Sequence, residues 1–280
     1  MAVSPLKGII CLFYVKTGIA VGRYSPVGDH TVIKIIPHDC DGFYALPQQY
    51  QGTSAYGVVC EEMQDELCHV DVCSGVVTLL GPVPQFEDED NWAVCDDKLF
   101  LCEPHPNIWK EACYRYIGSC HRMDASVCVC EGKMYAFGGE NTGNGNLSDV
   151  VDCYDPETNS WASLHRMPWC LTSQGCVAVQ HRIYAVGGRF SPYQYKYRAV
   201  DTLLCYDTHT DTWTELQPMP TPRFRPAVCV HGGRIYVMGG MNRRKKWLDV
   251  VESYDIQSNT WNSHAAMPWR FCRVWFGGVE

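Results

Sequence analysis

The side chains best suited to recognition chemistry gather in one short segment of the sequence. Tyrosines, basic residues and a serine share it, namely Arg189, Ser191, Tyr193, Tyr195, Lys196, Tyr197 and Arg198. A guanidinium group binds carboxylates through two parallel hydrogen bonds, and tyrosine and arginine are over-represented at binding hot spots. The segment therefore predicts a surface that recognises another protein.

A second basic segment follows fifty residues later. It reads Arg243-Arg244-Lys245-Lys246 and is followed by Trp247. In a chain of net charge -8, both segments stand out as local basic patches. A solvated hairpin tip, a nuclear-import signal and a site for an acidic partner all explain this second run, and the sequence leaves the three open.

Composition and motifs exclude several functional classes. The net charge of -8 and a pI near 5.7 argue against a nucleic-acid binder, which needs a basic face. No apolar stretch is long enough to span a bilayer. The sequence has no zinc-protease motif, no phosphate-binding loop and no nucleophile elbow. We therefore expect no enzyme activity, metal or cofactor, and no nucleic-acid or membrane partner.

The chain contains 17 cysteines, and no two of them have the C-x-x-C spacing of a zinc site. Several alternate with apolar residues in expected strands, where a thiol acts as a small apolar side chain. Reduced, buried thiols in an intracellular protein are the plain interpretation. The alternative is a redox sensor, for which Cys272 between Arg270 and Arg273 is the candidate.

The elements that position these side chains are encoded by a threefold repeat in residues 119–268. In each copy a Tyr-Asp pair follows a glycine pair, a tryptophan follows the tyrosine by seven residues, and Met-Pro begins six residues later. The glycine pairs are Gly138-Gly139, Gly187-Gly188 and Gly239-Gly240, and the aromatic landmarks are Tyr154, Trp161, Tyr206, Trp213, Tyr254 and Trp261. A period near fifty residues is typical of a propeller array.

Each copy predicts four short antiparallel strands. In the third copy, residues 228–230 and 234–238 form a hairpin across His231-Gly232-Gly233, and residues 250–254 and 260–262 supply two more strands. Four such strands make one blade of a β-propeller. We expect the repeated tyrosines and tryptophans to fill the space between neighbouring blades.

Residues 119–268 resemble the kelch repeats of the Kelch-like proteins that carry BTB and BACK domains. The resemblance implies an all-β, kelch-type β-propeller of six four-stranded blades over residues 1–280. Residues 119–167, 168–219 and 220–267 are the clear repeats, whereas 1–118 holds degenerate blades at about 1–46, 47–83 and 84–118. Residues 268–280 are expected to close the ring as the innermost strand of the first blade. A cut-off repeat marked by Gly277-Gly278 is the alternative.

The resemblance also implies a binding face. In similar kelch domains, ligand contacts come from fourteen residues before each glycine pair and from just after it. The first position gives Asp124, Ser173 and Arg225; the second gives Glu140, Arg189 and Met241, with Thr142, Ser191 and Arg243 two residues further on, and Arg244 beside them. An arginine pair at the mouth of the central channel suits an acidic or phosphorylated peptide, although Asp124 and Glu140 depart from the family pattern.

By the same resemblance, the chain is expected to be the substrate-recognition module of a cullin-RING ubiquitin ligase adaptor. Contact with the cullin would come only through a BTB domain that this chain lacks. The alternative is a cytoskeletal, actin-associated kelch scaffold. The copper-radical oxidases that share the fold need a copper site of two tyrosines and a histidine with a partner cysteine, and that motif is not recognisable here. A cytoplasmic location is expected, with nuclear import as an alternative.

Overall fold

The structure is a computed structural model, and it describes residues 122–141, 143–191 and 197–267 in full. Elsewhere it describes the backbone of the strands named below, with side chains at residues 55, 66–71 and 76–81. Among these described residues no helix has the length and hydropathy that a membrane span needs.

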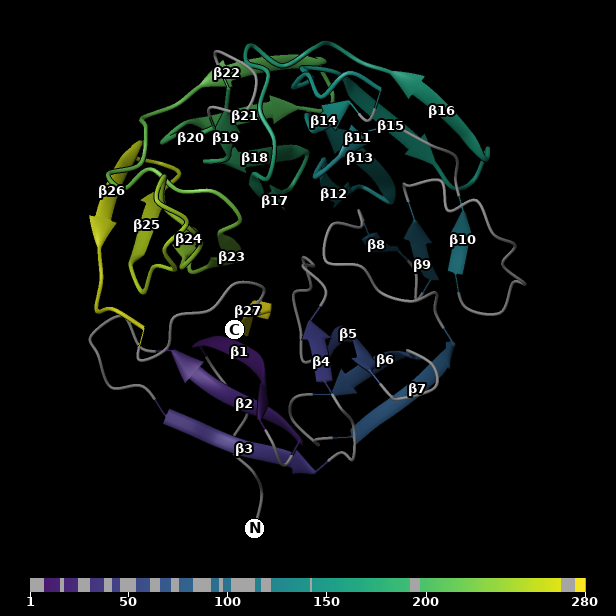
Figure 1. The fold of residues 1–280 in the computed structure, drawn as a ribbon, viewed down its shortest axis with the longest axis vertical. Coiled ribbons are helices and arrows are strands. Elements are labelled where there is room, and N and C mark those ends of the chain that lie inside the picture. The colour runs from purple at the N-terminus through teal and green to yellow at the C-terminus, as the bar shows by residue number, and fades with distance from the viewer. Residues whose placement is uncertain are drawn as a thin grey trace.

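Most of the described strands form six sheets that stand in a ring, each with one strand near the ring axis (Figure 1). Two short pairs lie outside these six sheets, namely β11 (Arg122–Met123) with β14 (Glu140–Asn141) and β19 (Arg189–Phe190) with β20 (Arg198–Ala199). We number these sheets as blades in chain order. Blade 1 contains β27 (Trp275–Val279), β1 (Gly8–Val15), β2 (Gly18–Tyr24) and β3 (Thr31–Pro37); blade 2 contains β4 (Gly42–Ala45), β5 (Ser54–Cys60), β6 (Glu66–Asp71) and β7 (Val76–Pro82); blade 3 contains β8 (Trp92–Cys95), β9 (Lys98–Leu101) and β10 (Tyr114–Tyr116).

The three clear repeats form the next three blades. Blade 4 contains β12 (Ser126–Cys130), β13 (Lys133–Phe137), β15 (Val151–Asp155) and β16 (Ser160–Ser163); blade 5 contains β17 (Gly175–Val179), β18 (Arg182–Val186), β21 (Leu203–Asp207) and β22 (Thr212–Glu215); blade 6 contains β23 (Ala227–His231), β24 (Arg234–Met238), β25 (Val251–Asp255) and β26 (Thr260–Ser263). All neighbouring strands within these three blades are antiparallel, as the repeat predicts.

The two ends of the chain meet in blade 1. Strand β27 pairs antiparallel with β1, from Gly8 opposite Val279 to Leu12 opposite Trp275. Strand β27 therefore lies in blade 1 beside β1, the place that the closing-strand hypothesis gives to residues 268–280. Because β27 takes the innermost place, β4 is released to begin blade 2, where it pairs with β5. The blade boundary expected at residue 46 was wrong for this reason.

Blade 3 departs from the regular pattern. Strands β8 and β9 form the expected hairpin, but β10 runs parallel to β9 instead of antiparallel. Trp109, which we aligned with the repeated tryptophans, lies outside the described residues. In the described residues this blade has three strands rather than the expected four.

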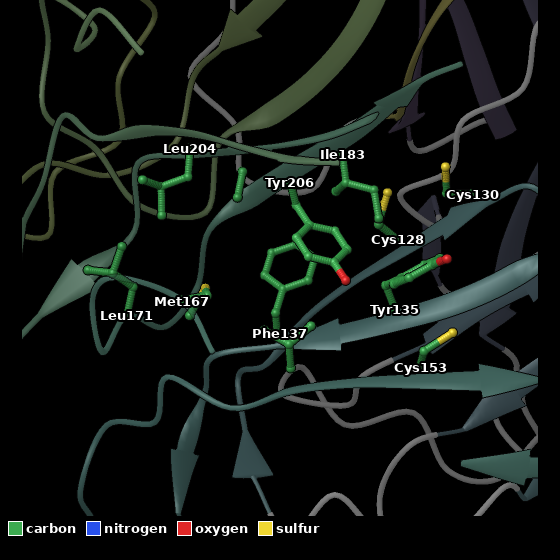
Figure 2. Packing of buried hydrophobic residues seen from close by; sticks show 12 residues of the cluster. Cys128, Cys130, Tyr135, Phe137, Cys153, Met167, Leu171, Ile183, Leu204 and Tyr206 are labelled. Carbon is green, nitrogen blue, oxygen red and sulfur yellow. The ribbon is translucent and has the colours of Figure 1, made fainter. Parts of the chain in front are cut away.

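Both faces of the central strands are buried because a blade lies on each side. In β18, Ile183 and Ala185 join a cluster with Phe137 of blade 4, whereas Tyr184 and Val186 join a second cluster with blade 6. Figure 2 shows the first of these clusters, in which Tyr206 and Phe137 bring rings from two blades into one core. The strand period of two thus assigns alternate side chains to the two neighbours.

The repeated aromatic residues connect neighbouring blades. The Tyr206 hydroxyl donates to Oδ1 of Asp211 at 2.6 Å, and the same oxygen accepts the His165 N–H of blade 4 at 2.9 Å. Trp213 Nε1 donates to the His165 carbonyl at 3.0 Å. Blades 5 and 6 repeat the arrangement through Tyr254, Asn259, Trp261 and Gln217. The repeated tyrosines and tryptophans therefore make the contacts between neighbouring blades.

The glycine pairs lie where the next blade comes closest. Gly187 has a φ of 66°, and a Cβ there would lie 2.3 Å from the Arg223 carbonyl oxygen. Gly188 donates its N–H to that same carbonyl at 2.9 Å. Only glycine combines the left-handed conformation with this approach, which explains the invariant pair in the three copies.

Candidate ligand-binding face

The backbone brings together the two sequence positions that the family pattern marks, because the residue just before the first position pairs with the second. In each clear repeat, the segment before the first strand pairs with the segment after the glycines: Met123 with Glu140, Thr172 with Arg189, and Phe224 with Met241. Residues seventeen positions apart in sequence therefore lie side by side at one end of the blade. The ring brings the three pairs to the same face.

The residue after each pairing segment adopts a left-handed conformation. The φ angles are 53° at Asp124, 57° at Ser173 and 50° at Arg225, which is uncommon for residues other than glycine. Ser173 donates its N–H to the Asp124 carbonyl at 3.0 Å, and Arg225 donates to the Ser173 carbonyl at 2.8 Å. These bonds link blades 4, 5 and 6 and fix the three side chains relative to one another.

Asp124 binds both arginines of the face. Its Oδ2 accepts from Nη2 of Arg189 at 2.5 Å, and its Oδ1 accepts from Nη2 of Arg225 at 2.7 Å. The side chains are 14%, 15% and 23% exposed, respectively. One carboxylate therefore joins three blades, and the two arginines point to the same place.

Aromatic rings hold the Arg189 guanidinium. Its central carbon lies 4.7 Å from the ring centre of Tyr197 and 5.2 Å from that of Phe224, within the range of cation–π contacts. The Tyr197 hydroxyl donates to Glu140 at 2.7 Å. These contacts orient Arg189 before any ligand arrives. We call Asp124, Arg189, Arg225, Tyr197 and Phe224 the arginine cluster.

The remaining candidates lie outside the arginine cluster. Ser173 is buried, and its hydroxyl has no partner among the described residues. Ser191 is half-buried, and Arg198 is exposed on β20 (Arg198–Ala199). Arg243 and Arg244 are exposed on a turn closed by hydrogen bonds to Asn242. Tyr193, Tyr195, Lys196 and Thr142 lie outside the described residues.

Sequence reasoning missed two contributions to this face. Asp124 was named as a contact position that departs from the family pattern, but the sequence did not predict that it joins the two arginines. Phe224 was not predicted at all, although it directly precedes Arg225. In the sequence, Asp124 and Arg225 precede the glycine pair of their own repeat by the same number of residues. This equal spacing predicts that the two side chains lie on the same face of the propeller.

The described cysteines are free thiols. Burial raises the pKa of Cys130 to about 11, and burial also raises the pKa of Cys153 and Cys205. These thiols are protonated at neutral pH and are poor nucleophiles. Cys272, the candidate sensor, lies outside the described residues. In the described part of the chain, no group of three His, Cys, Asp or Glu side chains could hold a metal ion.

Sheets of antiparallel strands in a closed ring, with a repeated inter-blade aromatic contact, define the class of kelch-type β-propellers. Residues 86–268 match the family model described as the KLHDC2/KLHL20/DRC7 Kelch-repeats domain. The chain belongs to the Kelch-repeat family.

Two curated relatives show how much of a longer protein this match represents. Human Kelch repeat and BTB domain-containing protein 8 is 31% identical over 150 residues, which are 52% of this chain and 23% of that protein. Kelch-like protein 36 of Bos taurus is 28% identical over 233 residues, which are 74% of this chain and 36% of that protein. The chain thus spans a minor part of these relatives, and the matches support a protein-binding Kelch module.

A solved structure supports the fold. The structure of YjhT has a TM-score of 0.50 to this chain at 16% sequence identity, and the match covers 83% of this chain and 68% of that one.

Proposed function

We propose that this chain binds a protein ligand at the arginine cluster and serves as the substrate-recognition module of a cullin-RING ubiquitin ligase adaptor, acting in the cytoplasm. Relatives whose names include a BTB domain support the ligase role, because such a domain supplies the cullin contact in the family that the sequence resembles. The cluster itself provides the recognition chemistry.

The observation that carries this proposal is the convergence of three blades on one partly exposed charged cluster. Asp124, Arg189 and Arg225 come from separate repeats, yet they meet within hydrogen-bonding distance. Their backbones adopt or adjoin left-handed conformations, which store strain and often occur at ligand-binding positions. Arginine beside aromatic rings is the composition of a binding hot spot.

The test is affinity purification from cell lysate with an Arg189→Ala, Arg225→Asn double variant. Asparagine suits position 225 because it tolerates the left-handed conformation better than alanine. We expect the variant to lose specific protein partners that the unmodified chain retains. The matched control is Arg182→Ala with Arg234→Ala, since these partly exposed arginines begin β18 and β24 at the opposite end of the blades.

The outcomes separate the binding site from the ligase role. If the double variant keeps every partner, the binding site lies elsewhere. If partners are lost, depletion of the protein in cells tests the second part, because the substrate of a ligase should accumulate. A partner whose abundance stays constant would instead indicate a scaffold, and actin co-sedimentation would identify the cytoskeletal alternative.

A further inference from the structure

Asp124 occupies the position on the two arginines that an acidic ligand would use. Each of its carboxylate oxygens accepts a hydrogen bond from a different guanidinium. Position 124 is equivalent to Ser173 and Arg225 in the other two clear repeats, so the sequence places an anion where its neighbours carry a neutral and a cationic group. The protein thereby supplies its own carboxylate to the cluster.

The charge at this point is therefore low. Two arginines and one aspartate leave a net charge of +1 (2 - 1) in the cluster, and the nearby Glu140 bonded to Tyr197 brings the sum to zero. Asp124 and Arg189 are mostly shielded from water. Charges interact more strongly in such a shielded site than in bulk solvent. A second carboxylate arriving at the same arginines would lie close to that of Asp124 and be repelled.

We propose that Asp124 determines the charge specificity of the face, so that it rejects peptides that place carboxylates at this point. Replacing Asp124 by a neutral residue converts the face into a site for acidic peptides. This inference rests on the proposed function, since it assumes that ligands reach the arginine cluster. Specificity through a repulsive group is a general device of selective interfaces.

The probe is a fluorescently labelled hexaglutamate peptide, with binding measured by fluorescence polarisation at low salt. We expect Asp124→Asn to bind it at least about tenfold more tightly than the unmodified chain, because a like charge is removed and two guanidinium groups are freed. Asparagine keeps the shape of the side chain and tolerates the left-handed backbone. Asp124→Ser is the second variant, since serine occupies the equivalent position of blade 5 at a φ of 57°.

Two controls isolate the effect. Glu157→Gln removes the same charge from an exposed turn between β15 and β16, at the other end of the blade, and should leave the affinity unchanged. Adding Arg225→Asn to Asp124→Asn should abolish the gain. Equal binding by the unmodified chain and both folded Asp124 variants, or an equal gain with Glu157→Gln, would overturn the proposal.

The result also distinguishes this inference from the proposed function. If neither Asp124 variant gains hexaglutamate binding while Arg189→Ala with Arg225→Asn still loses its cellular partners, the face binds ligands but Asp124 does not set their charge. If the gain appears while the cellular partners remain on the arginine variant, Asp124 controls the cluster, but the biological ligand binds elsewhere.

Discussion

Arg223 and Glu252 form an ion pair at 2.6 Å inside blade 6, where the two side chains are 0% and 2% exposed. The equivalent positions of blade 4 hold Arg122 and Asp152, which pair at 2.9 Å. Blade 5 instead has buried leucines at these positions, Leu171 and Leu204. The same place in the fold is thus filled by an ion pair in two blades and by an apolar pair in the blade between them.

This alternation predicts non-additive mutations. Arg223→Leu alone should destabilise the protein by about 3–5 kcal/mol because it leaves the buried Glu252 charge without its partner. The double variant Arg223→Leu with Glu252→Leu should lose less stability than Arg223→Leu alone, since it copies the leucine pair of blade 5. Urea denaturation of the single and double variants measures the difference. A double variant as unstable as the sum of the singles would contradict the prediction.

Trp213 should be important for blade docking. Its ring lies 4.8 Å from Tyr206 and 6.1 Å from Phe137 between ring centres, and its Nε1 bonds to the His165 carbonyl. Because the side chain is only partly buried, Trp213→Ala should lower the free energy of unfolding by about 3 kcal/mol, the low end for a core tryptophan. The control is Trp169→Ala, whose 45% exposed side chain should change stability by less than about 1 kcal/mol. Similar melting temperatures of both variants would refute the role of Trp213.

The close approach at the glycine pairs should make alanine costly there. Gly187→Ala combines left-handed strain with a Cβ 2.3 Å from the Arg223 carbonyl, and we expect a loss of about 3–5 kcal/mol. Gly232→Ala is the matched control, because its φ is 55° but nothing lies within 4 Å of the added Cβ. It should cost only about 1–2 kcal/mol. Chemical denaturation compares the free energies of unfolding of the two variants. Equal losses would show that the left-handed conformation alone, and not the close approach of the Cβ, causes the destabilisation.

His264 should make blade 6 sensitive to mild acid. Burial lowers the pKa of this histidine, and its Nε2 lies 2.7 Å from the Ser253 hydroxyl. The unfolded chain, with a histidine pKa near 6.5, therefore binds more protons than the folded protein at and below that pH. Stability is fully present above about pH 7 and should fall as the pH drops through about 6.5 toward the lower pKa of the folded state.

A substitution copied from the other blades tests this pH effect. Blades 4 and 5 have Leu164 and Leu216 at the position of His264. His264→Leu should therefore show a smaller loss of stability between pH 7.5 and pH 5.5 than the unmodified protein in urea denaturation. Adding Ser253→Cys restores the residue type that Cys153 and Cys205 supply in the other blades. An identical pH dependence in all three proteins would exclude His264 as the cause.

The sequence alone determined the repeat and much of its physics. The β-rich runs of the clear repeats were sufficient to predict four strands in each, and the repeated Tyr206 and Trp213 positions to predict an aromatic contact between blades. Local patterns are readable because a strand alternates its side chains and a tight approach requires glycine. Closure by the C-terminal strand also followed, because an open propeller edge needs a partner.

Only the tertiary structure decided what the side chains of the candidate binding face contact. Arg189 and Arg225 follow Asp124 by 65 and 101 residues, respectively. No local sequence pattern therefore shows that one carboxylate binds both arginines. The ring of blades brings them together, and left-handed backbones aim them at one another. The sequence therefore specified the blades, whereas the charge of the candidate binding face emerged only when three blades were placed around a common axis.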